Sequence, residues 1–241
     1  MPFTRPHHWV RWLLATIAVL VVLAGAGPFI YIHFFNGSPP TELSLSPTST
    51  PASESGSTRT ANTAASGPVA GTWEVGPGSI VGYRVNEVLL GQSATAVGRT
   101  MSVTGHLTIL GTTVTAGTFR VPMATVHSDK SQRDAQFDGR IMDVAQYSTG
   151  TFTLTAPIGF APLPASGVIK DYTARGNLTL HGTTRAVTFT LTAERKGAQI
   201  EVAGHIPVLF ADYNIQNPSF AGFVTTQDHG LLEFLLVFSK A

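Results

Sequence analysis

The densest group of charged side chains lies in residues 128–143, where chemistry with a polar ligand is most easily placed. Asp129 with Arg133 and Lys130 with Asp134 have the i,i+4 spacing of helical ion pairs, with Ser128 as the expected N-cap and Gly139 as the expected end of the helix. Two interpretations are compatible with this pattern. The charges pair with one another on a solvated surface connection, or the connection borders a cavity and two arginines meet an anionic or polar head group. The head-group candidates are Arg133 and Arg140.

The histidines give no metal-binding pattern. None of them is spaced as H-x-x-x-H or H-E-x-x-H, so scattered surface or core histidines are expected and no metal site is predicted. The domain histidines are His106, His127, His181, His205 and His229.

Motifs for covalent and nucleotide chemistry are missing from the sequence. There is no G-x-S-x-G, no G-x-G-x-x-G and no P-loop, which leaves no hydrolase elbow and no nucleotide cradle. The chain has no Cys, which excludes disulfides, thiolate zinc sites and a cysteine nucleophile. His127 with Asp129 or Asp134 could form an acid/base pair for an enzyme acting on lipids. Because no nucleophile or oxyanion motif accompanies it, a protein without catalytic residues or cofactor is the favoured interpretation.

Composition narrows the class of protein further. Only 12% of the 241 residues are charged and the net charge is +1, whereas about a quarter of an ordinary soluble chain is charged. A nucleic-acid surface needs a clustered basic footprint, and this balance does not supply one. A membrane segment joined to a weakly charged domain is the expectation.

The N-terminal third divides into three segments. Residues 12–35 contain no Asp, Glu, Lys or Arg, and as a helix they would span about 36 Å against a hydrocarbon core of about 30 Å. Because Arg5 and Arg11 precede this segment, residues 1–11 are predicted to be cytoplasmic, and everything after residue 36 to be extracytoplasmic, on a single-pass protein of the cytoplasmic membrane. A cleaved signal peptide ending near Ala26 is the alternative.

Residues 36–70 are rich in Ser, Thr, Pro, Ala and Gly. With almost no large apolar side chain, they are predicted to be a disordered linker that buries too little surface to offset its ordering entropy. Its expected reach is about 30 Å or more.

Residues 71–241 form one domain with a period of two. In residues 151–158 and 186–193, apolar residues alternate with threonines, as in half-buried antiparallel strands. Further strands are predicted at residues 80–89, 103–109, 114–122, 172–180, 200–207 and 231–239. With no helical periodicity between them, about eight short strands favour an all-β sandwich or an antiparallel up-and-down barrel. The pattern G-x-L-T-apolar-x-G-T-T occurs at residues 105–113 and again at 176–184, and both copies are predicted to be hairpins.

The run at residues 231–238 is apolar on both faces apart from Glu233. An eight-stranded barrel is wide enough to be filled by side chains or to hold one elongated ligand, and composition leaves both possibilities open. The side chains expected to face inward are Val81, Tyr83, Val85, Phe119, Val121, Phe152, Leu154, Val187, Phe189, Leu191, Phe234, Leu236 and Phe238.

The order and spacing of several short motifs resemble the YceI-like family across the whole domain. They lie at residues 72–75, 78–85, 133–134, 143, 147–152 and 176–187. The resemblance implies a lipocalin-like antiparallel β-barrel that binds polyisoprenoid or other long-chain amphiphiles outside the cytoplasm. The sequence departs from the family pattern at residues 76–79, 140–143 and 211–214, which lie near connections, so the departures bear on the ligand head group more than on the fold.

Three functions therefore stand as hypotheses. The preferred one is a membrane-anchored protein that holds the tail of an isoprenoid or acyl lipid inside the barrel. The second is a filled barrel that binds an envelope partner through its rim loops, and the third is the enzyme that uses His127.

Overall fold

The computed structural model describes residue 16 and residues 39–45, 69–89, 91–219 and 224–241. The cytoplasmic segment predicted at residues 1–11 and the membrane crossing predicted at residues 12–35 lie outside this part, apart from Thr16. Within the described residues, no helix is both long and apolar enough to span a bilayer.

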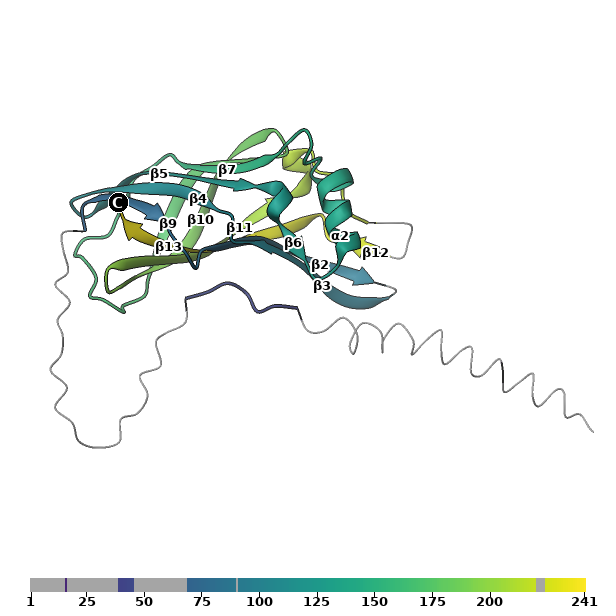
Figure 1. The fold of residues 1–241 in the computed structure, drawn as a ribbon, viewed down its shortest axis with the longest axis horizontal. Coiled ribbons are helices and arrows are strands. Elements are labelled where there is room, and N and C mark those ends of the chain that lie inside the picture. The colour runs from purple at the N-terminus through teal and green to yellow at the C-terminus, as the bar shows by residue number, and fades with distance from the viewer. Residues whose placement is uncertain (1–15, 17–38, 46–68, 90, 220–223) are drawn as a thin grey trace, which may run out of the picture.

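Eight strands close into a ring (Figure 1). Each pairs antiparallel with the next, and the last pairs with the first, so the prediction of an all-β antiparallel barrel is confirmed. In ring order they are β1 (Gly71–Val75), β4 (Thr104–Leu110), β5 (Thr113–Pro122), β7 (Thr149–Leu154), β9 (Lys170–Leu180), β10 (Thr183–Lys196), β11 (Gln199–Leu209) and β13 (His229–Lys240).

The sheet extends beyond the ring through a hairpin of β2 (Ile80–Leu89) and β3 (Gln92–Thr100). The first half of β13 pairs with β2, whereas its last residues pair with β1. The short strands β6 (His127–Ser128), β8 (Ile158–Gly159) and β12 (Val224–Thr226) pair with β3, β5 and β2, respectively. Sequence patterning did not find β1 or β3, because β3 is built mainly from Ser, Ala, Thr and Gly and shows little apolar alternation. The single strand expected at residues 151–158 is divided between β7 and β8.

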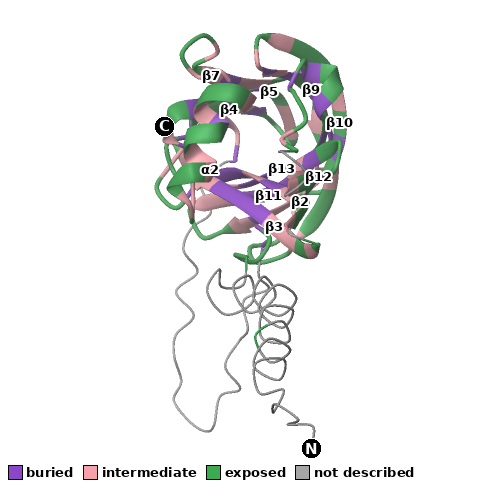
Figure 2. Cartoon of the chain, turned by 90° about the vertical axis from the view of Figure 1, so that its right-hand side faces the viewer, coloured by how far each residue is buried: buried purple, intermediate pink, exposed green. Residues whose placement is uncertain are grey.

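Short helices lie at one end of the ring, the end that faces the viewer in Figure 2, which we call the helical end. They are η2 (Met123–Thr125), α2 (Ser131–Gln136), the π-helical turn η3 (Phe137–Ile141) and η4 (Phe210–Tyr213).

The charged connection forms the expected helix but not the expected cap. Lys130 is the N-cap residue, and Ser128 instead donates its hydroxyl to Asp134 Oδ1 at 2.6 Å. The i,i+4 pair between Asp129 and Arg133 forms as predicted. The two residues of the other predicted pair, Lys130 and Asp134, have different partners. Asp134 accepts from Ser128, and Lys130 Nζ lies 3.9 Å from Asp129 Oδ2. Gly139 lies inside η3 and does not end the helix.

Both predicted hairpins are present. β9 and β10 are joined by His181 and Gly182, which have φ values of 47° and 71°. Positive φ at both central residues is typical of a type I′ turn, whose twist matches that of the flanking strands. The matching hairpin of β4 and β5 turns at Gly111.

The interpretation of residues 36–70 as an unpacked linker is wrong at residues 39–45. These residues lie against the outside of the barrel, with Leu43 and Leu45 only 7% and 8% exposed. The two leucines share one face of an extended segment. Composition over 35 residues hides such a short apolar stretch.

Candidate ligand cavity

A cavity of about 360 Å³ runs through the barrel. It falls in the size range of small-molecule binding sites, about 300–1,000 Å³. The lining side chains come from strands all around the ring, from α2 and η3 at the helical end, and from residues 160–168 at the opposite end, and they are almost entirely apolar. The described side chains therefore leave space inside the barrel, which favours a ligand cavity over a filled barrel.

All but one of the side chains expected to face inward line this cavity. Val187 packs against the core without reaching the cavity. Those that line it are Val81, Tyr83, Val85, Phe119, Val121, Phe152, Leu154, Phe189, Leu191, Phe234, Leu236 and Phe238.

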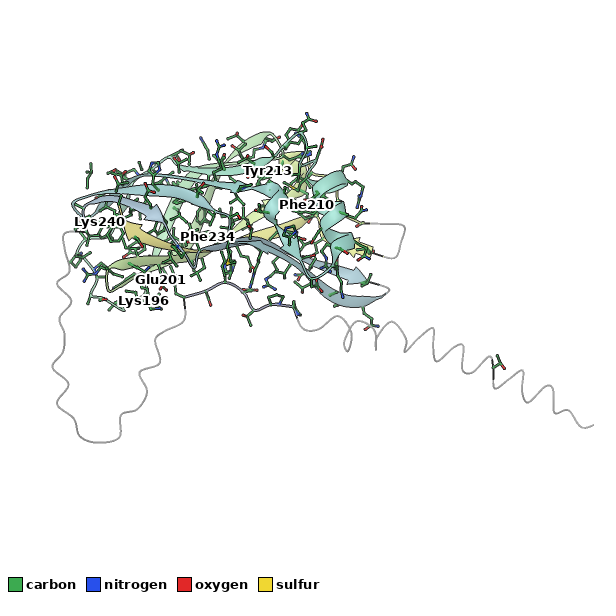
Figure 3. All side chains as sticks on the ribbon, in the orientation of Figure 1. Lys196, Glu201, Phe210, Tyr213, Phe234 and Lys240 are labelled. Carbon is green, nitrogen blue, oxygen red and sulfur yellow. The ribbon has the colours of Figure 1, made fainter. Side chains whose placement is uncertain are left out.

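Five phenylalanines form a belt around the interior. Phe119 lies 5.8 Å from Phe238 and 6.4 Å from Phe152, measured between ring centroids. Phe189 continues the belt at 5.5 Å from Phe152 and 5.9 Å from Phe234. Figure 3 labels Phe234 in the middle of the barrel, with Lys196 and Lys240 toward the end away from the helices. Phe119 and Phe152 are stacked and the other three contacts are edge-to-face. Both arrangements are favoured by aromatic rings, so the belt gives the cavity a well-packed waist.

Close approach of backbone to ring shapes this waist at Gly176 on β9. A Cβ built there would lie 2.2 Å from the ring of Phe152 on the neighbouring strand. Only glycine leaves room for the ring, so Gly176 fixes where Phe152 lies.

Charged side chains lie at both ends of the lining, with Glu87 and Arg133 at the helical end and Glu194 and Arg195 at the opposite end. Arg133 lies in the lining as expected, with its guanidinium paired to Asp129 and 3.7 Å from Glu87 Oε1. Burial raises the pKa of Glu87, and Arg133 opposes that shift. Burial also raises the pKa of Tyr83, whose ring stacks on Phe137 at 5.1 Å. The helical end therefore offers one cation and one readily neutralised carboxyl group to a ligand.

Arg140 and Glu87 depart from the sequence-based assignment. Arg140 does not line the cavity, because it donates to Gln136 Oε1 and to the carbonyl of Pro218, each at 3.1 Å. Glu87 was missed, although it follows Val81, Tyr83 and Val85 at a spacing of two on the same strand, which is the signal that could have found it. Arg195, at the opposite end, also lines the cavity.

The proposed acid/base pair lies elsewhere. His127 Nδ1 is 3.5 Å from Asp134 Oδ2, but the imidazole is exposed and neither residue belongs to the cavity lining. His181 packs on Tyr147 at 4.4 Å. In the part of the chain that the structure describes, no three His, Asp or Glu side chains gather where they could hold a metal ion.

Comparisons with known proteins agree with this geometry. Residues 73–238 match the YceI family, described as the YceI-like domain. A polyisoprenoid binding domain from Saccharophagus degradans, implicated in plant cell wall breakdown, superposes with a TM-score of 0.58 at 15% identity, covering 71% of this chain and 99% of that one. Burkholderia cenocepacia BcnA superposes with a TM-score of 0.50 at 20% identity, covering 64% and 95%. No curated protein sequence matches the chain.

Because the family match at residues 73–238 spans most of the chain, the chain belongs to the YceI-like family. The barrel of this family member encloses an apolar cavity of a size in which small-molecule ligands bind.

Proposed function

We propose that this protein is anchored in the cytoplasmic membrane and holds the tail of an isoprenoid or other long-chain lipid inside its extracytoplasmic barrel. The observation that carries the proposal is the continuous apolar cavity with its phenylalanine belt. The polyisoprenoid binding domain of Saccharophagus degradans has the same fold, which supports an isoprenoid as the first ligand class to test.

The physical chemistry favours a tail over a compact polar ligand. Each methylene moved from water into the cavity contributes about 0.8 kcal/mol, so about ten methylenes outweigh the cost of immobilising the chain. The lining offers few polar partners, and a sugar or nucleotide would leave its own polar groups unpaired there. Arg133 would meet the head group at the helical end.

The membrane placement rests on sequence. The charge-free run at residues 12–35 and the arginines before it favour a single crossing with the barrel outside. A binding role without catalysis is also part of the proposal, because the one histidine–carboxylate pair considered for catalysis lies outside the cavity lining.

Native mass spectrometry of the full chain, purified in detergent from bacterial membranes, tests the ligand. We expect a stoichiometric long-chain species that organic extraction releases and identifies. A mass without ligand that persists after incubation with isoprenoid quinones and acyl lipids would overturn the proposal.

Tryptophan substitutions separate the cavity from the surface. Leu154→Trp and Phe189→Trp add volume inside the cavity and are expected to abolish lipid retention while the far-ultraviolet circular dichroism of the barrel is unchanged. Thr153→Trp and Thr188→Trp place the same ring on the exposed face of the same strands and should leave retention intact. Equal retention in all four variants would show that the lipid is not held in this cavity.

A further inference from the structure

A buried carboxylate lies on the outer wall of the barrel, where solvent is expected. Glu233 of β13 is 0% exposed, although its neighbours Leu232 and Phe234 line the cavity on the inner face. Its Oε2 accepts from Arg84 Nε at 3.2 Å, and its Oε1 accepts from Arg99 Nε and Nη2 at 2.9 and 2.7 Å. The two arginines belong to β2 and β3. One carboxylate therefore holds two guanidinium groups and leaves an excess positive charge and unused donors on this wall.

Residues 39–45 supply the acceptors for those donors. Arg84 Nη2 donates to the carbonyl of Pro40 at 2.6 Å, and Arg99 Nη2 donates to the carbonyl of Thr41. A proline has no N–H of its own, so a Pro-Pro-Thr stretch presents carbonyls without competing donors at the prolines. Charge-assisted bonds of this kind are stronger than bonds between neutral groups.

The absence of a side chain at Gly82 leaves room for Arg99 beside Glu233. Gly82 is in register with both Glu233 and Arg99. A Cβ at this position would lie 2.8 Å from Arg99 Cγ and 2.2 Å from a backbone oxygen. Any larger residue would push Arg99 away from the carboxylate.

The second half of the segment is apolar. Leu43 and Ser44 lie against Thr192, Ala203 and His205 of β10 and β11, and Ala203 on this outer face is only 1% exposed. In Figure 1 the segment runs along the outside of the barrel, below β2 and β3. The wall thus combines two cationic donors at one end with an apolar floor at the other, and the docked segment matches both.

We propose that the outer wall of β2, β3, β13 and β11, with the adjoining residues of β10 around Thr192, is a binding surface for the chain's own residues 39–45, which we call the strap. The strap holds the barrel beside the membrane. Only residues 36–38 separate the predicted crossing from the strap. An extended chain from residue 35 to residue 39 reaches about 13 Å. An undocked linker would instead let the barrel range over about 30 Å or more. The positional half of this proposal, that the strap keeps the barrel near the membrane, rests on the proposed membrane anchor. The docking half, that residues 39–45 bind the outer wall, does not.

Cysteine accessibility tests docking in the full chain, which has no cysteine of its own. Leu43→Cys should react with a maleimide at least about tenfold more slowly than Thr188→Cys, which is on an exposed face, because reaction requires the strap to open. Adding Arg99→Gln should remove most of that protection, whereas Arg175→Gln, which changes an exposed arginine on β9, should not. Labelling of Leu43→Cys as fast as Thr188→Cys would overturn docking.

Energy transfer tests the positional half. The full chain, labelled at Thr188→Cys and reconstituted in nanodiscs that carry acceptor lipids, is compared with the same chain carrying Leu43→Asp and Leu45→Asp. We expect lower transfer efficiency and a broader distance distribution once the strap is released, with unchanged circular dichroism. Identical transfer in the two proteins would overturn the positional half. A chain that alkaline carbonate strips from membranes would refute the anchor, while the cysteine result would still decide docking.

Discussion

Two outer walls of the same barrel differ in how they meet solvent. The wall formed by β9 and β10 presents Thr173, Arg175 and Thr188, all exposed, over an inner face of apolar side chains. We call it the threonine wall. The wall formed by β2, β13 and β11 has a buried outer face, because Glu233 and Ala203 face outward beneath the strap. We call it the strapped wall.

The difference shows two ways of building a strand. On the threonine wall, one face supplies the packing energy and the other only has to be soluble, which gives the alternation of a half-buried sheet. On the strapped wall both faces are buried, so apolar residues occupy both sides of β13 and the single charge among them needs ionic partners. An uninterrupted apolar strand in a barrel of this size therefore indicates a covered wall.

Glu233→Ala should produce the largest difference between the walls. Removing the carboxylate leaves the guanidinium groups of Arg84 and Arg99 without their shared partner in a buried site, and breaking a buried pair in this way costs about 3–5 kcal/mol. Thr188→Ala on the threonine wall should change the free energy of unfolding by less than about 0.5 kcal/mol. Urea unfolding of both variants makes the comparison. A cost below about 1 kcal/mol for Glu233→Ala would mean that the strapped wall is not stabilised by this group.

Gly176→Ala should show that the threonine wall depends on its inner face. The added Cβ would overlap the ring of Phe152, and overpacking of this kind costs about 1–3 kcal/mol. Gly159→Ala provides the control, since nothing lies within 4 Å of the position where its Cβ would be. Thermal unfolding should separate the two variants by several degrees, and equal midpoints would mean that Phe152 relaxes freely.

Features that depend on alternation within one strand were predictable from the sequence. The inward set on β2, β5, β7 and β13 was found because side chains two residues apart share a face, and the paired turns were found from their glycines. Val187 was the exception because facing inward does not place a side chain at the cavity surface.

Features that depend on contacts between distant segments were not predictable. The strap was interpreted as linker because its contacts with Arg84 and Arg99 join positions that are 44 and 58 residues apart. Arg140 was assigned to the head-group site because charge density does not show which way a helical residue points. In both cases the deciding partner, a backbone carbonyl, has no signature in the sequence.

Glu87→Gln should give the smallest effect of the three substitutions, a change in lipid retention. Glu87 lies on the inner face of β2, at the helical end of the strapped wall. The pKa of Glu87 is raised from its ordinary value of 4.5 by burial, so the carboxyl group is protonated more readily in the folded chain than in the unfolded one. Its contribution to stability is full below pH 4.5 and is lost as the pH rises through the raised value. Ionised Glu87 also competes with an anionic head group for Arg133.

At pH 7 the variant should therefore retain an anionic lipid roughly threefold better than the wild type, in line with the ~0.2–1 kcal/mol of a partly exposed ion pair. Retention by the wild type should rise as the pH falls, and the two proteins should become equal below pH 4.5, where Glu87 is neutral. Retention of a lipid with an uncharged head group serves as the control and should be the same in both proteins at every pH. A difference that persisted with the uncharged lipid, or that grew in acid, would show that Glu87 shapes the cavity instead of competing for Arg133.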